Sequence, residues 1–301
     1  MLNAQGRVIC DLLLYRTPRT RYECKFTPPG EAKEIDELLI ECDANLASGL
    51  ADTLYGYRVR RKVTLELMND QQVWCLYPKL TNNFSDLTSA EGTTQTSQLM
   101  MLKSLNAIKE VVDNNMTIVS DPRLDLMGIR ILSKSSADFN FIKTSIQSQF
   151  GDHSISESSV KDYIVHRYEL GVGEGPQDFP EGNCLPLESN ADFLNSVSFN
   201  KGCYLGQELT ARIHYTGVVR KRLMPSVLDI NTSKPSEIPL VSGSDIVDET
   251  SGKKIGVLRN VVRGHALSLL RHDMIIPSTK LIHEASKIKL TTWKPYWWNL
   301  T

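Results

Sequence analysis

Cys203 has the neighbours of a cysteine that binds metal or reacts. It lies between Gly202 and Gly206, which free the backbone around it, and Lys201 precedes it by two positions. Residues 207–211 predict a short helix that begins just after it. The positive end of such a helix and the Lys201 ammonium both favour the thiolate, the form of cysteine that binds metal or attacks an electrophile. The sequence therefore indicates that Cys203 is a metal ligand or a nucleophile.

The segment around Cys203 is basic although the whole chain is not. Residues 201–222 contain five basic residues and one acidic residue, a local charge of +4, whereas the chain has a formal net charge of -1. Such a patch suits an anionic ligand or an acidic partner surface. The alternative is that Cys203 packs as a small apolar side chain and the basic residues form a solvated rim. The basic residues are Lys201, Arg212, Arg220, Lys221 and Arg222, and the acidic one is Glu208.

The other cysteines do not suggest a metal site of their own. The chain has six cysteines, and none stands in a CxxC or CxxH spacing, which disfavours a self-contained zinc or iron-sulfur site and a disulfide scaffold. His214 lies eleven residues after Cys203 and could add one ligand, although a lone histidine is more often a packed or surface residue. Four cysteines stand in strand-like runs and are expected to be packed: Cys10, Cys24, Cys42 and Cys75.

Length and composition describe an ordinary globular chain. Its 301 residues suffice for about two domains, and 41% hydrophobic and 23% charged residues give no sign of disorder. The near-neutral charge disfavours a nucleic-acid-binding protein, in which residues 58–62 and 220–222 would make the basic contacts. No apolar run approaches the roughly 18 residues of a membrane span. The glycine run at 171–176 has no preceding strand and no following GK[ST], so we interpret it as a polar loop.

Short strands and a few helices must position these residues. We expect Asp43 to cap a helix in which leucines recur every four residues from Leu46, and a second helix over 158–170 to end at Gly171. Beyond residue 218, short apolar runs cut by turn signals predict a small β-barrel. The fold class is therefore α+β. Strands are predicted at 8–15, 37–42, 63–67, 73–77, 116–119 and 128–132, and a surface loop at 81–99.

The run from Lys201 to Glu208 resembles the KGCYxGQE signature of the YgfZ/GcvT-like folate-binding family. Residues 185–199 and 217–223 are similar to the mitochondrial branch of that family, the iron-sulfur cluster assembly factors, as are residues 2–7 and 166–172. The resemblance extends over nearly the whole chain and implies a protein of the mitochondrial matrix. The first residues are also Arg-rich and acid-poor, as in a mitochondrial presequence, but the strand-like composition of 8–15 favours a part of the fold.

The resemblance implies a GcvT-like ring of three domains, two of them mixed α+β and the last a small barrel. Domain one is expected at 1–30 and 160–212, domain two at 31–159 and the barrel domain at 213–301. Members of the family carry a first strand-helix portion before the sequence that starts here, so we expect domain one to lack its amino-terminal portion.

The resemblance also implies a partner and a process. A cluster normally takes four ligands, mostly thiolates, and Cys203 supplies one. We therefore expect Cys203 to hold a [2Fe-2S] cluster together with an A-type iron-sulfur carrier protein and to promote maturation of apo [4Fe-4S] client proteins. Neither nucleic acid nor a membrane span is expected. Whether the protein is an enzyme stays open.

The folate-binding relatives imply a second set of site residues. Glu188 falls where those proteins bind the pterin, and Arg222 near a basic residue that holds the folate tail. Where they have two successive acids, this chain has Cys10-Asp11, and the missing carboxylate disfavours aminomethyl transfer. The alternative function is thus a tetrahydrofolate-dependent one-carbon transferase or demethylase. The expected cofactor-binding residues are Glu188, Arg222, Asp11, Lys201, Tyr204, Gln207 and Glu208.

Overall fold

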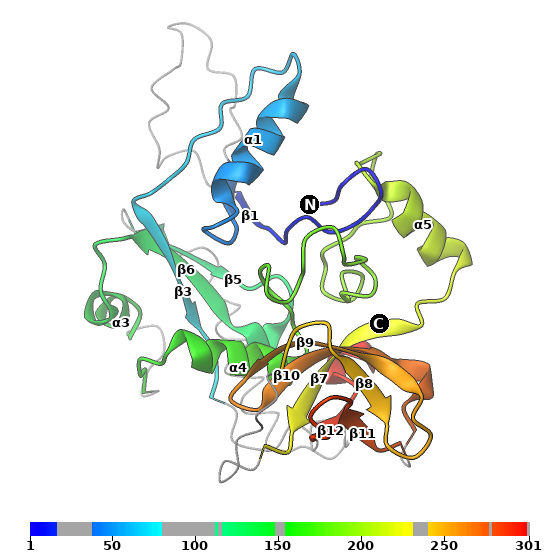
Figure 1. Cartoon of the computed structure of the whole chain (residues 1–301). Coiled ribbons are helices and arrows are strands. Elements are labelled where there is room, and N and C mark those ends of the chain that lie inside the picture. Colours follow the sequence, from blue (N-terminus) through cyan, green and yellow to red (C-terminus); the bar gives the residue numbers. More distant parts are fainter. Residues whose placement is uncertain are drawn as a thin grey trace, which may run out of the picture.

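A computed structural model describes residues 1–16, 38–79, 112–113, 116–147, 154–230, 240–276 and 279–299. Within these ranges the strands form a two-stranded sheet, a four-stranded sheet and a closed barrel of six strands (Figure 1). The predicted α+β class and the carboxyl-terminal barrel are confirmed. Cys24 and the predicted loop at 81–99 lie outside the described residues.

The amino-terminal elements are a small antiparallel sheet and a helix. β1 (Leu13–Arg16) pairs with β2 (Leu38–Glu41), and α1 (Ala47–Arg58) follows. The strand predicted at 8–15 is confined to its last residues, because the chain before β1 makes a tight loop closed by a bridge between Leu2 and Val8. Asp43 does not cap α1: its Oδ1 accepts the Asn45 N-H at 2.9 Å in the preceding turn, and the N-cap residue, Leu46, makes no side-chain bond.

The strand predicted at 63–67 is not formed. These residues have no regular secondary structure, and none pairs with a described strand. Their carbonyl groups instead accept hydrogen bonds from α1, from Arg58 Nη1 to Val63 O at 3.0 Å and from Tyr55 Oη to Leu65 O at 2.8 Å. Alternation of apolar and polar residues was therefore not enough to make a strand. The carbonyl groups of Val63 and Leu65 accept hydrogen bonds from side chains and not from the backbone of a neighbouring strand.

The four-stranded antiparallel sheet confirms the other strands predicted in the middle of the chain. Its order is β3-β6-β5-β4, with β3 (Gln71–Leu76), β4 (Val112–Asp113), β5 (Met116–Ser120) and β6 (Ile129–Lys134). A 3-10 turn, η2 (Asp125–Met127), precedes β6, and α3 (Phe139–Gln147) packs on the sheet. The core between them is built from Ile118, Ile129, Ile131, Ile142 and Ile146.

Helix α4 (Val160–Leu170) begins two residues after the predicted start and ends at the predicted residue. Ser159 Oγ accepts the Asp162 N-H, while the Asp162 carboxylate accepts the Ser159 N-H at 2.9 Å, so the first turn has a complete capping box. Gly171 ends the helix with φ of 77°, the left-handed conformation that glycine adopts freely. α4 packs against barrel strands, and the loops after it lead to α5 (Gln207–Thr216). The predicted helix after Cys203 is confirmed.

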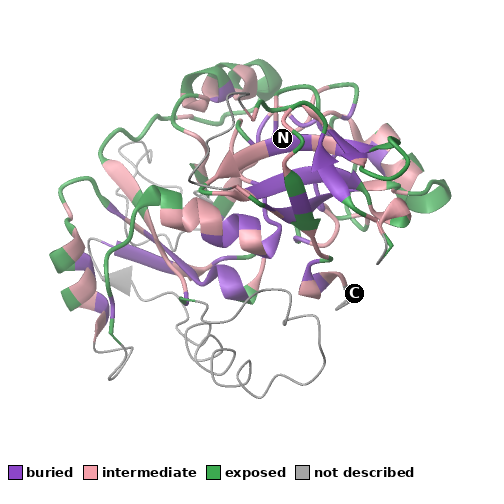
Figure 2. Ribbon diagram, turned by 60° about the horizontal axis from the view of Figure 1, so that its bottom comes forward, coloured by how far each residue is buried: buried purple, intermediate pink, exposed green. Residues whose placement is uncertain are grey.

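The barrel closes in the order β10-β7-β12-β11-β8-β9. Closure pairs every edge, and buried residues gather on the barrel strands in Figure 2. Short 3-10 turns follow β10 and β12, and the second returns Trp297 to the core beside α4, where its Nε1 donates to Leu170 O at 2.8 Å. The elements are β7 (Lys221–Leu228), β8 (Asp245–Asp248), β9 (Lys254–Val262), β10 (His265–Arg271), η3 (His272–Met274), β11 (Leu281–His283), β12 (Lys289–Thr292) and η4 (Tyr296–Asn299).

No helix in the described part of the chain combines the length and the hydropathy that a bilayer crossing demands.

Candidate functional site

The loop that carries Cys203 is braced by its own neighbours. The Tyr204 N-H donates to Gln207 Oε1 at 3.1 Å, which ties the loop to the first turn of α5. The Lys201 ammonium lies 4.8 Å from the centre of the Tyr204 ring, a cation-π contact. Lys201, Tyr204 and Gln207 thus hold the shape of the loop, while Glu208 is exposed in the first turn of α5, where the helix dipole favours a negative charge.

Cys203 is free and exposed. Of the other free cysteines that the structure describes, Cys10 and Cys184 are buried, and Cys42 and Cys75 are partly buried. Burial raises the pKa of each of these four thiols, which disfavours their thiolates. Across the described ranges, Cys203 is the cysteine that a second protein can reach directly.

The amino-terminal loop packs against the Cys203 loop at Gly206. Gly6 and Gly206 both have φ of 75°, and they face each other so closely that a Cβ on Gly206 would lie 2.4 Å from Asn3 O and 2.8 Å from Gly6 Cα. Asn3 holds the loop in shape, since its Oδ1 accepts the N-H groups of Gln5 at 3.0 Å and Arg7 at 2.9 Å. Only glycine fits at these positions, so the opening residues of the chain help to position Cys203.

His214 is engaged in an aromatic stack. Its ring lies parallel to that of Phe199, with ring centres 3.5 Å apart and an angle of 8° between the planes. Tyr215 packs edge-on against both rings. The structure therefore gives His214 a packing partner at the carboxyl-terminal end of α5, whereas Cys203 lies at the amino-terminal end of that helix.

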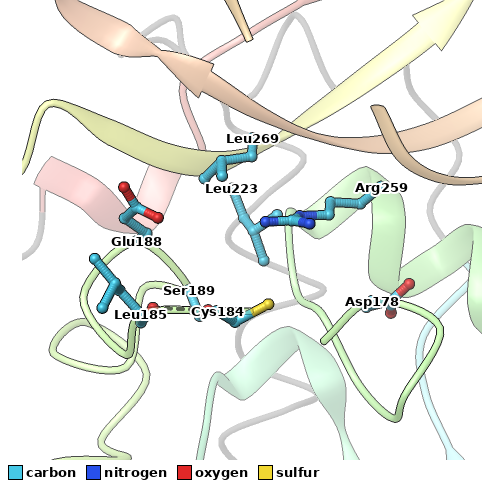
Figure 3. Close-up of a pocket in the computed structure, with 8 residues that line it drawn as sticks. All are labelled: Asp178, Cys184, Leu185, Glu188, Ser189, Leu223, Arg259 and Leu269. Atoms are coloured by element: carbon cyan, nitrogen blue, oxygen red, sulfur yellow. Dashed lines mark hydrogen bonds between the residues drawn. The ribbon is translucent and has the colours of Figure 1, made fainter. Parts of the chain in front are cut away.

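Glu188 lies in a narrow pocket between the turn at 184–189 and the barrel wall (Figure 3). Burial raises the pKa of Glu188, an effect partly offset by the positive charges of Lys221, Arg259 and Arg7. Arg259 reaches from β9 toward Glu188 and is only 8% exposed, and its Nε has no hydrogen-bond partner among the described residues. An arginine in this state is poised for an acceptor, because a buried, unpaired donor is costly.

Asp11 lines a neighbouring cavity of about 240 Å³ between β1, β2, α4 and the loop at 174–178. Its carboxylate accepts the Gly175 N-H at 3.0 and 3.2 Å. Burial, followed by the charge of Glu174, raises the pKa of Asp11. Asp178 lines both this cavity and the Glu188 pocket, so the two predicted acids lie on adjoining pockets and not in one.

Arg222 lines neither pocket, and its guanidinium is already engaged. It forms a two-pronged ion pair with Asp192, with both N-O distances at 2.8 Å, and donates to Leu187 O at 3.0 Å. Its Cζ lies 4.3 Å from the centre of the Phe193 ring. These contacts give Arg222 an anchoring role for the segment after Glu188 and leave it poorly placed to hold a folate tail.

A buried ion-pair network beside the Asp11 cavity was missed by the sequence reading. Glu174 Oε2 lies 2.7 Å from Arg123 and 3.7 Å from Arg130 and accepts the Tyr163 hydroxyl at 3.0 Å. Burial opposes ionisation of Glu174, but the surrounding arginines lower its pKa to about 2. The loop predicted at 171–176 is present, yet it carries the centre of this network. We name the network the Glu174 cluster; its members are Glu41, Asp121, Arg123, Arg130, Arg167, Glu174 and Asp178.

One signal in the sequence could have pointed to the Glu174 cluster. Arg130 stands between Ile129 and Ile131 in a strand, a position that alternation assigns to the polar face. In the structure that face is covered, and Arg130 pairs with Glu41 and Asp121. Arg259 likewise stands on a barrel strand, where alternation alone gives no reason to select it.

Comparison with known proteins places the chain in a family. Residues 220–300 match the model described as the CAF17 carboxyl-terminal beta-barrel domain, the same part of the chain that forms the barrel. The mouse protein named iron-sulfur cluster assembly factor IBA57, mitochondrial, is 36% identical over 300 residues, which are 99% of this chain and 71% of that protein. Its human counterpart is 33% identical over 298 residues, again 99% and 71%. A homologue from Pyricularia oryzae is 29% identical, over 92% of this chain and 63% of that protein.

The likeness to the mouse and human proteins covers nearly the whole of this chain and includes the loop of Cys203 as well as the barrel. The chain therefore belongs to the IBA57 family of mitochondrial iron-sulfur cluster assembly factors.

Proposed function

We propose that this protein promotes the maturation of [4Fe-4S] proteins by holding a [2Fe-2S] cluster jointly with an A-type carrier, with Cys203 as its own ligand. The observation that carries the proposal is an exposed cysteine that has no group of further potential metal ligands around it in the described part of the chain. Cys203 is exposed, and within the described ranges no three His, Cys, Asp or Glu side chains are grouped so as to hold a metal ion. A cluster bound here needs ligands from a second protein.

A shared cluster suits an assembly factor because it can leave. A cluster with several ligands on one chain is held tightly, whereas one that depends on a protein-protein contact is released when that contact opens. The braced loop serves this purpose: Gln207 and the close pair Gly6 and Gly206 fix the backbone around Cys203, while the thiol stays accessible.

The relatives' names state the mitochondrion, and iron-sulfur cluster assembly in mitochondria is the process to which this chain is assigned. Within that compartment we place it in the matrix, with apo [4Fe-4S] proteins as clients. The architecture we infer is a three-domain ring with the domain boundaries predicted from the sequence. The closed barrel at its carboxyl-terminal end supports this arrangement.

The test is anaerobic reconstitution of the full chain with an A-type carrier, iron and sulfide. The mixed complex is isolated by gel filtration, and its thiolate-to-iron absorption is measured. We expect Cys203→Ser to abolish cluster-containing mixed complex, and the matched variant Cys42→Ser, at a partly buried cysteine, to retain it. Mixed complex with unchanged absorption in Cys203→Ser would refute the proposal.

Tetrahydrofolate binding is a second candidate, favoured by one observation. Arg259 is buried with an unpaired Nε beside Glu188, so the pocket offers both a carboxylate for pterin N-H groups and a donor for an acceptor on the ligand. Bound tetrahydrofolate would supply one-carbon transfer chemistry. The pocket has almost no free volume, so its side chains must move to admit a pterin.

Calorimetry with tetrahydrofolate under anaerobic conditions tests this candidate. Glu188→Gln is expected to weaken binding, whereas Glu181→Gln, at an exposed glutamate of the same region, leaves it unchanged. Absence of binding to the wild-type protein removes the candidate. The one-carbon transferase alternative also predicts tetrahydrofolate-dependent turnover. That turnover should persist in Cys203→Ser and disappear in Glu188→Ala.

A further inference from the structure

The surface next to Cys203 has an unusual composition for an exposed helix. Glu208, Arg212 and Tyr215 are exposed and spaced by four and three residues, so they form one stripe along α5, while Thr210 is buried. Tyr215 is 66% exposed and Val218, just beyond the helix, is 76% exposed. We name this surface the α5 face; it comprises Lys201, Leu205, Glu208, Arg212, Tyr215, Val218 and Arg220.

Tyr215 is exposed but not loose. Its ring packs edge-on against His214, with centres 4.8 Å apart, and against Phe199, with centres 6.1 Å apart. A tyrosine held by its neighbours loses little conformational entropy when a partner covers it, which is why such aromatic residues act as anchors in interfaces. Two rings of α5 and the ring of Phe199 therefore form a preorganised aromatic centre near the carboxyl-terminal end of the helix.

The length of α5 is similar to the radius of an ordinary protein-protein interface. The helix has ten residues and is about 15 Å long at 1.5 Å per residue. A standard interface covers about 800 Å² on each partner, a disc of roughly 16 Å radius. Phe199, four residues before Cys203 in the chain, stacks on His214 near the other end of the helix. An interface of this size that includes Cys203 and follows α5 therefore covers the aromatic centre.

The charge of the α5 face selects the kind of partner. Among the seven residues of the α5 face, Lys201, Arg212 and Arg220 are exposed bases and Glu208 is the one acid. Arg222, which adds to the charge in the sequence, does not contribute, because it is buried in its pair with Asp192. The complementary surface is acidic and has an apolar patch to receive Tyr215.

We propose that the α5 face is the docking surface for the cluster-loaded carrier, with Tyr215 as its apolar anchor and Arg212 and Arg220 steering an acidic surface of the carrier toward Cys203. This proposal rests on the proposed function, since it takes the protein that completes the cluster as the occupant. It adds where that protein sits and which chemistry recognises it.

The experiment measures binding of cluster-loaded A-type carrier to the full chain, at low and high ionic strength, by anaerobic biolayer interferometry. Tyr215→Ala is expected to weaken binding at least tenfold, mainly through faster dissociation. Arg212→Glu combined with Arg220→Glu changes the charge of the α5 face from about +2 to about -2, so it is expected to slow association at low salt and to reverse the salt dependence, because salt then screens a repulsion. Circular dichroism confirms that each variant is folded.

Matched controls come from a second exposed surface with the same residue types. Tyr57 is 58% exposed and Arg60 is exposed beyond α1, far along the chain from Cys203. Tyr57→Ala and Arg60→Glu should bind like the wild type. The docking proposal is overturned if Tyr215→Ala and the double charge variant both bind the carrier within twofold of the wild type. If Cys203→Ser still fails to share a cluster in that case, the proposed function stands. Wild-type cluster sharing by Cys203→Ser overturns the shared cluster itself.

Discussion

The Cys203 loop and the Glu174 cluster use polar side chains in opposite ways. In the loop, a reactive thiol is left exposed and the backbone is fixed by glycines and one side-chain hydrogen bond. In the cluster, three arginines are buried and each has a carboxylate within 4.0 Å. The comparison separates two tasks: the cluster holds the molecule together, and the loop presents a group that another protein must complete.

Removing the charge at the centre of the Glu174 cluster should have the largest effect. Glu174→Gln leaves Arg123 and Arg130 with fewer counter-charges, and breaking a buried ion pair costs about 3–5 kcal/mol. We expect that loss in the free energy of unfolding, measured by urea titration at pH 7. Cluster sharing per folded molecule should not change. A loss of less than about 1 kcal/mol would show that solvent already screens the network.

Acid should weaken the same region. The pKa of Glu174 is about 2 in the folded protein against an ordinary 4.5, so the folded state binds its proton less readily than the unfolded state. The stability that Glu174 contributes is therefore present above about pH 4.5 and is lost as the pH falls toward 2. We expect this contribution, roughly 3 kcal/mol from the size of the shift, as the difference between urea titrations of the wild type and of Glu174→Gln, because other carboxylates titrate in the same range. The curves of wild type and Glu174→Gln should converge at low pH, and parallel curves would contradict the assignment.

The next effect tests the packing behind Cys203. Gly206→Ala places a methyl group 2.4 Å from Asn3 O, whereas Gly182→Ala, at a similar φ of 66°, meets nothing within 4 Å. Both variants carry the left-handed penalty of about 1–2 kcal/mol, so their difference measures the close contact. We expect Gly206→Ala to lose a further 1–3 kcal/mol, by order of magnitude, and to impair cluster sharing. Equal behaviour of the two variants would mean that the amino-terminal loop does not position Cys203.

The Cys203 loop is easier to identify from the sequence than the Glu174 cluster, because the signals of the loop are local. The capping box of Ser159 and Asp162, the helix end at Gly171 and the helix after Gly206 each depend on residues within a few positions. The barrel is recognisable for the same reason, because turn signals separate its short strands.

The cluster has no such local signature. Glu174 pairs with Arg123, 51 positions earlier, and Arg130 with Glu41, 89 positions earlier. The Asp121–Arg123 and Arg167–Asp178 pairs are closer in the sequence, 2 and 11 positions apart. The long-range pairs form only when the sheets, α4 and the loop of Glu174 pack, so no local pattern joins the whole set. The absence of a strand at 63–67 has a similar origin, since side chains of α1 take the carbonyl groups that a neighbouring strand would have used.

The smallest expected effect concerns Lys201, which could stabilise the Cys203 loop or act on the bound iron-sulfur cluster. If Lys201 acts mainly on the Tyr204 ring, then Lys201→Gln should cost about 0.5–1 kcal/mol, the range of an exposed cation-π contact. Cluster absorption should stay near that of the wild type when carrier is saturating, because the thiol and the glycine contacts are untouched. Lys201→Arg, which keeps the charge over the ring, should restore the stability. The contrary outcome is that Lys201→Gln loses the iron-sulfur cluster with no change in stability, and that Lys201→Arg restores the cluster. That result would mean that the positive charge of Lys201 acts on the iron-sulfur cluster and not on the Tyr204 ring.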